Sequence, residues 1–199
     1  MSTTATQAAR AELAQTFAGD LIGPDDATYD ETRALFNAMI DKRPALIARC
    51  TSADDVAAVI GFARSHDLPL AIRAGGHNGA GLASVDDGVV IDLSRLKAIS
   101  VDPGTRTVRV GGGCLWGEVD AATDEHDLAV PSGIISTTGV AGLTLGGGTG
   151  YLTRQHGLTI DNLLSAQLVL ADGRQVAANA DETPASSGPS AAAAATSES

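Results

Sequence analysis

The sequence predicts an α+β fold, because a strand–helix–strand segment and two strand–turn–strand segments occur in one chain. The first lies at residues 46–73, and the other two lie at residues 99–110 and 164–177. Apolar residues make up 44% of the 199 positions, which is enough for a core in one compact domain or two small ones. Only 3% of the residues are aromatic, so we expect a core of Val, Ile, Leu and Ala.

The first 45 residues have a mixed pattern that predicts two short helices, over residues 6–17 and 30–39. The segment 23–26, Gly-Pro-Asp-Asp, is typical of a turn and separates them. We therefore interpret residues 1–39 as an N-terminal helical segment.

Residues 46–73 predict a β-α-β unit. The strands cover residues 46–50 and 68–72. Between them, Ser52 is typical of a helix N-cap, and Asp55 can accept hydrogen bonds from amides of the first turn. The helix is expected to bury one face, because four apolar residues recur at helical spacing. They are Val56, Val59, Ile60 and Ala63.

The region that follows is rich in strands. Residues 88–93 form a continuous apolar run typical of a buried strand. Residues 99–110 predict a hairpin around Asp-Pro-Gly-Thr, and residues 115–126 predict a helix with one apolar face. Residues 164–177 predict a second hairpin around Ala-Asp-Gly.

Composition excludes several classes of partner. The net charge of −11 argues against nucleic acid, which needs a basic surface to replace phosphate counterions. Cys50 and Cys114 are too few for a disulfide scaffold and are interpreted as reduced structural thiols, and the four histidines show no metal-ligand pattern. The N-terminus lacks a signal-peptide core and no apolar run reaches membrane length, so we expect a cytoplasmic protein without a membrane partner.

Two glycine-rich segments, residues 73–81 and 139–150, carry the candidate binding chemistry. Successive backbone N–H groups in such segments can form a concave site for an anion, although tight turns remain the alternative interpretation. Neither segment has the Lys of a phosphate-binding P-loop or the context of a dinucleotide-binding G-x-G-x-x-G. A G-x-S-x-G nucleophile elbow is absent from the sequence.

His77 lies inside the first glycine-rich segment, where small neighbours leave room for a planar cofactor. Neutral imidazole is a competent nucleophile near neutral pH. On these residues alone, a turn histidine with a backbone hydrogen bond is the favoured interpretation. His66, His126 and His156 are interpreted as structural.

Residues 73–78, 131–133 and 139–163 together resemble the FAD-binding domain of the vanillyl-alcohol oxidase type, also called the PCMH-type domain. Within that type, the sequence is most similar to the berberine-bridge-enzyme-like and 6-hydroxy-D-nicotine-oxidase-like oxidoreductases. The resemblance covers about residues 40–182. It implies a FAD-binding domain of two α/β subdomains, assigned to residues 40–178, with the family's substrate domain missing.

The resemblance also implies roles for individual residues. His77 is expected to bond to the flavin 8α carbon. The FAD diphosphate is expected to be wrapped by Arg73, Ala74, Gly75, Gly76, His77 and Asn78. The diphosphate and isoalloxazine are expected to contact Gly133, Thr137, Thr138, Gly139, Gly142, Gly146, Gly147 and Gly148, with Val169 near the adenine end.

A single covalent bond is expected, because Ile135 occupies the place where some members of the family carry a second, cysteinyl attachment. No residue of this chain is assigned as catalytic, since family members supply the catalytic base from the second domain. The implied function is therefore that of a flavin-dependent oxidase acting on a small alcohol, amine or sugar-like substrate. The alternatives are an inactive flavin-binding remnant and a dehydrogenase with non-covalent FAD.

Residues 179–199 are expected to form a disordered tail, since from residue 183 they contain only Thr, Pro, Ala, Ser, Gly and one Glu. The family instead continues with Leu-Phe-Trp-Ala-Leu-Arg-Gly-Gly-Gly-Gly-Asn-Phe-Gly-Val. Codons that encode residues 185–199 can be chosen so that a one-base shift translates into that motif in full. We therefore expect that the tail is frameshifted and that the chain alone is inactive. Sequencing the gene past codon 178 tests the frameshift.

Overall fold

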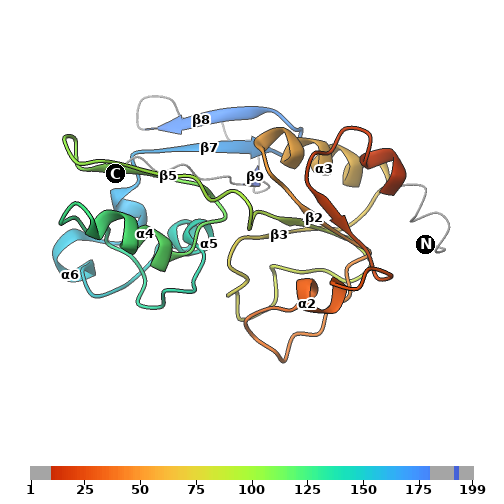
Figure 1. The fold of residues 1–199 in the computed structure, drawn as a ribbon, viewed down its shortest axis with the longest axis horizontal. Helices are drawn as coiled ribbons and strands as arrows, with labels where there is room; N and C mark the ends of the chain where they lie inside the picture. Colours follow the sequence, from red (N-terminus) through yellow and green to blue (C-terminus); the bar gives the residue numbers. More distant parts are fainter. Residues whose placement is uncertain (1–9, 180–190, 193–199) are drawn as a thin grey trace.

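The computed structural model describes residues 10–179 and 191–192, and it confirms the α+β class. In Figure 1 the molecule has two parts that lie side by side. One part, on the right, is a sheet with a helix packed across it; the other, on the left, has short helices below two long hairpins. This arrangement agrees with the predicted pair of α/β subdomains.

The first part is built on a four-stranded sheet. Its strands are β1 (Asp20–Ile22), β2 (Leu46–Arg49), β3 (Leu70–Arg73) and β4 (Val89–Asp92), in the order β1-β2-β4-β3. The predicted β-α-β unit is confirmed, but β4 lies between its two strands and pairs in parallel with both. All four residues of β4 are buried, which is why this strand takes a central place. The sequence did not predict β1, which pairs antiparallel with β2.

Helix α3 (Ala53–Ser65) covers one face of this sheet and begins as predicted. Ser52 Oγ accepts a hydrogen bond from the backbone N of Asp55 at 3.1 Å. Asp55 was expected to accept from amides of the first turn. Its carboxylate instead accepts from the backbone N of Thr51, before the N-cap, at 2.8 Å and from that of Ala18 at 3.0 Å, which attaches the N-terminal segment. The four apolar residues predicted on the inner face, Val56, Val59, Ile60 and Ala63, are all buried.

The helix predicted over residues 30–39 is wrong in its length. Helix α2 (Tyr29–Arg33) ends at Ala34, whose backbone is extended with φ −60° and ψ 140°. The chain then turns toward the first glycine-rich segment, where the backbone N of Phe36 donates to the carbonyl of Gly76 at 3.3 Å. A tertiary contact therefore replaces the last helical turns. Of the other predicted helix, residues 10–13 are helical and the start lies outside the described residues.

Both predicted hairpins are present, and the second of them packs against α3 through Val169. They are β5 (Ile99–Asp102) with β6 (Thr107–Val110), and β7 (Ser165–Leu170) with β8 (Gln175–Asn179). Between them in sequence lie α4 (Trp116–Asp124), α5 (Val140–Leu145), α6 (Thr153–His156) and a 3-10 turn over Ile160–Asn162. The second hydrophobic core is formed by Val108, Val110, Cys114, Trp116, Val119 and Val140. Within the described part of the chain, no helix has the length and apolarity needed to cross a membrane.

The C-terminal segment 179–199 lies mostly outside the described residues. Within it, the short strand β9 (Ala191–Ala192) pairs antiparallel with Val169 and Leu170 of β7. The disorder and the frameshift proposed for this segment stay predictions.

Both cysteines are free and fully buried, in agreement with structural thiols. Burial raises the pKa of Cys50, and burial together with the nearby Glu118 carboxylate raises the pKa of Cys114 to about 11. Since the thiolate is the reactive form, we expect iodoacetamide at pH 8 to modify neither thiol in the folded protein and both in urea. Mass spectrometry of the alkylated chain measures this, and rapid labelling of Cys114 in the native state would contradict its burial.

Candidate functional site

The first glycine-rich segment begins at a buried ion-pair network at the end of the parallel strands. Arg73 Nη2 lies 2.8 Å from Asp92 Oδ2, and Arg49 Nε lies 3.7 Å from the same oxygen. The other Asp92 oxygen accepts from the backbone N of Ser94 at 2.8 Å. Arg73 and Asp92 are the last residues of β3 and β4 and lie opposite each other in register. The network therefore fixes the position from which the segment leaves the sheet.

The two glycine-rich segments meet where Gly75 faces Gly139. A Cβ atom added to Gly75 would lie 2.3 Å from the backbone N of Gly139, and one added to Gly139 would lie 2.4 Å from that of Gly75. Only glycine at both positions allows the two backbones to approach so closely. Gly148, at φ +75°, has equally little space, because a Cβ atom added to it would lie 2.3 Å from Thr159 Oγ1.

A cavity of about 540 Å³ lies between these two segments, within the size range of cofactor sites. Its wall includes ten of the predicted site residues: Ala74, Gly75, Gly76, His77, Asn78, Thr138, Gly139, Gly142, Gly146 and Gly148. It also includes Ile72, Leu82, Ala83, Leu143 and Thr149, which the sequence did not single out. These five carry no chemical signature in sequence, since small and apolar residues are common in any core.

The chemistry of this cavity suits a ligand that is both anionic and flat. Among the described residues, no Lys or Arg lines it, so an anionic group here would be bound by main-chain N–H donors and by neutral side chains such as Asn78 and Thr138. A Cβ added to Gly142 would meet no protein atom within 4 Å, so the absent side chain leaves space on the cavity wall. Leu82, with 69% of its surface exposed, offers an apolar surface beside that space. These features fit a diphosphate and an aromatic ring system.

His77 forms part of this wall, and its ring also contacts Thr137 and Phe36. Its Nε2 atom lies 3.1 Å from Thr137 Oγ1, and its ring stacks on Phe36 with centroids 3.9 Å apart and planes inclined by 17°. A second cavity of about 360 Å³ is lined by His77, Phe36 and Thr137, among others. The His77 ring thus lies between the cavity formed by the glycine-rich segments and a supporting group of side chains. No motif in the sequence marks Phe36 as part of the site.

Five predicted site residues do not line the larger cavity: Arg73, Gly133, Thr137, Gly147 and Val169. Arg73 turns inward to Asp92, and Thr137 lines the second cavity. Gly133 packs on Leu143, whose Cδ1 would lie 2.3 Å from an added Cβ. Gly147 adopts φ +97°, which favours glycine and lets the segment turn.

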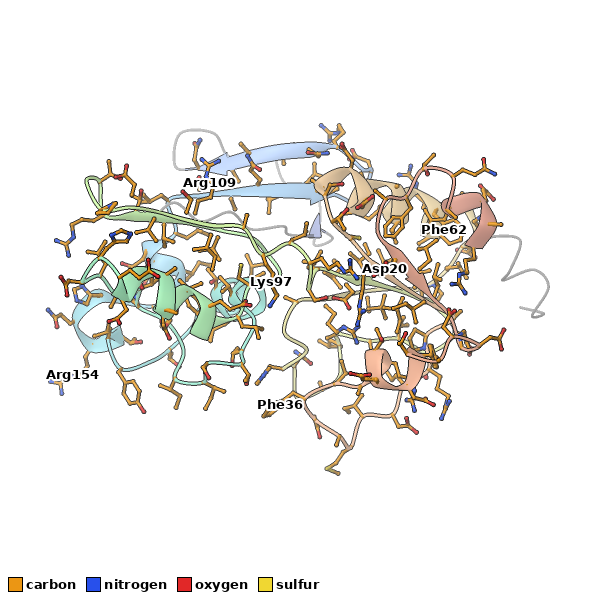
Figure 2. The ribbon with its side chains drawn as sticks, in the orientation of Figure 1. Asp20, Phe36, Phe62, Lys97, Arg109 and Arg154 are labelled. Atoms are coloured by element: carbon orange, nitrogen blue, oxygen red, sulfur yellow. The ribbon has the colours of Figure 1, made fainter. Side chains whose placement is uncertain are left out.

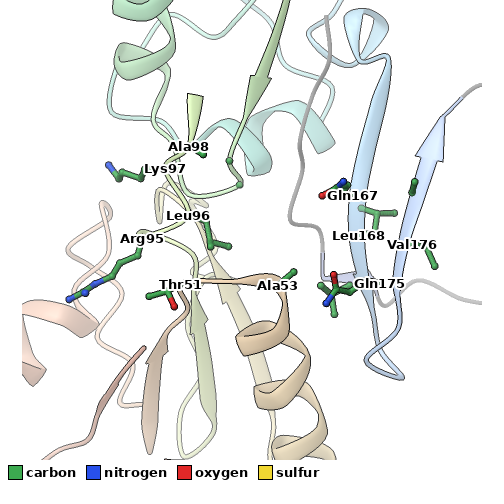
Figure 3. A pocket seen from close by; sticks show the side chains of 14 residues that line it. Thr51, Ala53, Arg95, Leu96, Lys97, Ala98, Gln167, Leu168, Gln175 and Val176 are labelled. Atoms are coloured by element: carbon green, nitrogen blue, oxygen red, sulfur yellow. The ribbon is translucent and has the colours of Figure 1, made fainter. Parts of the chain in front are cut away.

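Val169 lies apart from the glycine-rich cavity. It is 1% exposed, belongs to the core under α3, and borders a separate groove of about 440 Å³. Figure 3 shows that groove between the β7–β8 hairpin, the connection 95–98 and the start of α3. The predicted contact of Val169 with the adenine end of FAD stays a prediction.

The family of the chain follows from comparison with known sequences. The model of the FAD binding domain matches residues 44–179, more than two thirds of the chain, including both glycine-rich segments. The chain belongs to the FAD-binding domain family. This FAD-binding domain is 39% identical over 166 residues to (R)-6-hydroxynicotine oxidase of Paenarthrobacter nicotinovorans, a match that covers 83% of this chain and 36% of the oxidase.

Solved structures give the same result for the FAD-binding domain. The crystal structure of 6-hydroxy-D-nicotine oxidase from Arthrobacter nicotinovorans superposes with a TM-score of 0.83 at 38% identity, covering 84% of this chain and 37% of that one. Glucooligosaccharide oxidase from Acremonium strictum, which carries 6-S-cysteinyl, 8α-N1-histidyl FAD, superposes with a TM-score of 0.81 at 30% identity, covering 87% and 37%. This chain therefore spans little more than a third of the length of these relatives.

Proposed function

We propose that this FAD-binding domain holds FAD in the cavity between its two glycine-rich segments and is joined to it covalently through His77. The observation that carries the proposal is the place of the His77 ring, which forms part of a cavity wall in which six of the fifteen lining residues are glycine. Glycines there leave main-chain N–H groups for the diphosphate and space for the flavin ring. The histidyl FAD of glucooligosaccharide oxidase, a relative at 30% identity, supports the same assignment.

The covalent step balances as an oxidation by dioxygen. With FAD bound, His77 would supply an imidazole nitrogen to the 8α carbon. The new N–C bond would replace one C–H bond of the 8-methyl group and one imidazole N–H bond, and the two electrons and two protons released would pass through the flavin to dioxygen, giving hydrogen peroxide. One bond is proposed, because Ile135 supplies no thiol and the Cys114 thiol is fully buried.

Bound flavin supplies two-electron redox chemistry, so we further propose a role in oxidation of a small alcohol, amine or sugar-like substrate. The names of the relatives, a nicotine oxidase and an oligosaccharide oxidase, support this range. The second candidate is a domain that binds flavin without turnover, because no residue of the described site is assigned as a catalytic base. Oxygen consumption with candidate substrates separates the two: turnover supports the first candidate, and flavin binding without turnover supports the second.

The binding proposal is tested by incubating the purified 199-residue chain with FAD and precipitating it with acid. Yellow colour in the washed pellet means a covalent bond, whereas flavin released into the supernatant means non-covalent binding. A protein that binds no flavin before precipitation would contradict the proposed function altogether.

The unfilled space at Gly142 gives a prediction for FAD affinity. Gly142→Ala adds a methyl group that meets no protein atom but projects from the cavity wall, so we expect FAD to bind about tenfold more weakly or worse. The folded chain should lose no stability and gain up to about 1 kcal/mol, since Ala is favoured over Gly within a helix. Flavin fluorescence titration and urea unfolding measure the two quantities.

Gly61→Ala is the matched control, because Gly61 lies within α3, also has no atom within 4 Å of an added Cβ, and lines no cavity described above. It should give the same gain in stability with unchanged FAD affinity. Equal FAD affinity in both variants would place the flavin outside this cavity.

A further inference from the structure

Beyond the attachment itself, the structure contains a group that orients the reactive histidine. The loop after α2 lies against the first glycine-rich segment on both sides of His77. The backbone N of Phe36 donates to the carbonyl of Gly76 at 3.3 Å, and Asn37 Nδ2 donates to that of Gly79 at 3.2 Å. The loop is therefore fixed to the same backbone that carries the histidine.

This attachment places the Phe36 ring on one face of the His77 imidazole. The two rings are close to parallel, 17° apart, with centroids separated by 3.9 Å. Figure 2 shows Phe36 projecting from its loop toward the second part of the molecule, and 67% of its surface is exposed. Burial in the core does not explain its position, whereas the stacking on His77 is a specific tertiary contact of the ring. Rotation of the imidazole about χ2 is opposed by the loss of this stacking.

Thr137 contacts one of the two ring nitrogens and can therefore bias which of them carries the proton. Its Oγ1 atom lies 3.1 Å from His77 Nε2. A neutral imidazole carries one proton, and the nitrogen that bonds to carbon must present a lone pair. When Nε2 holds the proton and donates it to Thr137 Oγ1, the lone pair is on Nδ1.

We propose that Phe36 and Thr137 are positioning residues for flavin attachment, which hold His77 as the Nε2–H tautomer with Nδ1 free to bond to the 8α carbon. The inference rests on the proposed function and deepens it. Neither Phe36 nor Thr137 lines the glycine-rich cavity, and both line the second cavity, which His77 also lines. Phe36 has no expected contact with FAD, so its loss is expected to change the rate of attachment and not the affinity for free FAD.

The rate of attachment is measured by adding FAD to the flavin-free 199-residue chain and following the flavin that remains in acid-precipitated protein. Thr137→Val removes the hydroxyl at nearly constant shape, and Phe36→Leu removes the ring. Each is expected to slow attachment about tenfold. The conservative variants Thr137→Ser and Phe36→Tyr keep the hydroxyl and the aromatic ring, respectively, and should retain most of the parent rate of attachment. Because Phe36 and Thr137 are both exposed, none of these changes should unfold the chain.

Two further measurements separate positioning from binding and from failure of the proposed function. FAD affinity is compared in His77→Ala and in the double variant that adds Phe36→Leu, where no bond can form, and is expected to be equal. In flavin-free protein, ¹⁵N NMR of the His77 ring should show Nε2 protonated and Nδ1 unprotonated, with this preference lost in Thr137→Val.

Attachment at the parent rate in Thr137→Val and Phe36→Leu, or a proton on Nδ1 in the parent protein, would overturn the inference. If no variant retains flavin, the proposed function fails, and the NMR measurement still decides the tautomer. If flavin is retained equally by every variant except His77→Ala, the proposed function stands and the positioning role is wrong.

Discussion

His77→Ala is expected to leave no flavin in acid-precipitated protein, whereas the parent chain should give a yellow pellet. Alanine has no nucleophilic nitrogen, so the bond to the 8α carbon cannot form. Non-covalent binding should survive, because the glycine-rich walls that face the diphosphate are unchanged. Flavin absorbance of the washed pellet and of the supernatant measures both quantities in one sample.

The control for this prediction is His156→Ala. His156 is an exposed histidine at the end of α6 and lines neither of the cavities that include His77. It should retain flavin as the parent chain does. A yellow pellet from His77→Ala would show that another residue is attached to the flavin.

Asp92→Asn is expected to lower the free energy of unfolding by about 3–5 kcal/mol. Asp92 is 2% exposed and faces two guanidinium groups, those of Arg73 and Arg49. The amide removes the negative charge at nearly constant volume, which leaves the buried Arg73 cation uncompensated. Because Arg73 begins the first glycine-rich segment, FAD binding should weaken as well. Urea unfolding and flavin titration measure the two effects.

Asp172→Asn is the matched control, since it also removes a carboxylate from an ion pair with arginine. Its partner Arg174 lies 2.7 Å away, but both side chains are well exposed, and such pairs contribute less than about 1 kcal/mol. The two variants therefore separate the buried network from surface charge in general. Equal unfolding free energies for Asp92→Asn and the parent chain would mean that the network does not stabilise the sheet.

Several elements of the fold could be predicted because their signals are local. The N-cap Ser52 and the apolar spacing of the following helix depend on residues within a few turns, and the structure confirms both. The helix expected over residues 30–39 ends at Arg33, because the next residues bond to a segment some forty positions away. Strand β1 was not predicted for the same reason, since its partner β2 lies 24 or more residues further along the chain. Local propensity is outweighed wherever a distant hydrogen-bond partner is available.

The candidate site shows the same division. Ten of the predicted residues meet in one cavity. The resemblance to the family assigned them, and the glycine clusters that carry much of this resemblance are visible in the sequence. Arg73 was grouped with them by its neighbours, yet its side chain points to Asp92. A motif gives the order of residues along the chain. The direction of a side chain depends on the partner that the neighbouring strand offers, which for Arg73 is the Asp92 carboxylate.

The sequence by itself determined the fold class, both hairpins and the glycine-rich segments, because each is encoded in residue type and short-range spacing. His77 became the candidate attachment residue only through the resemblance to the PCMH-type family. Only the tertiary structure decided that Gly75 meets Gly139 and that Phe36 and Thr137 hold the His77 ring. These contacts join residues 41 to 64 positions apart, and no local pattern specifies which side chains a folded chain will bring within 4 Å of one another.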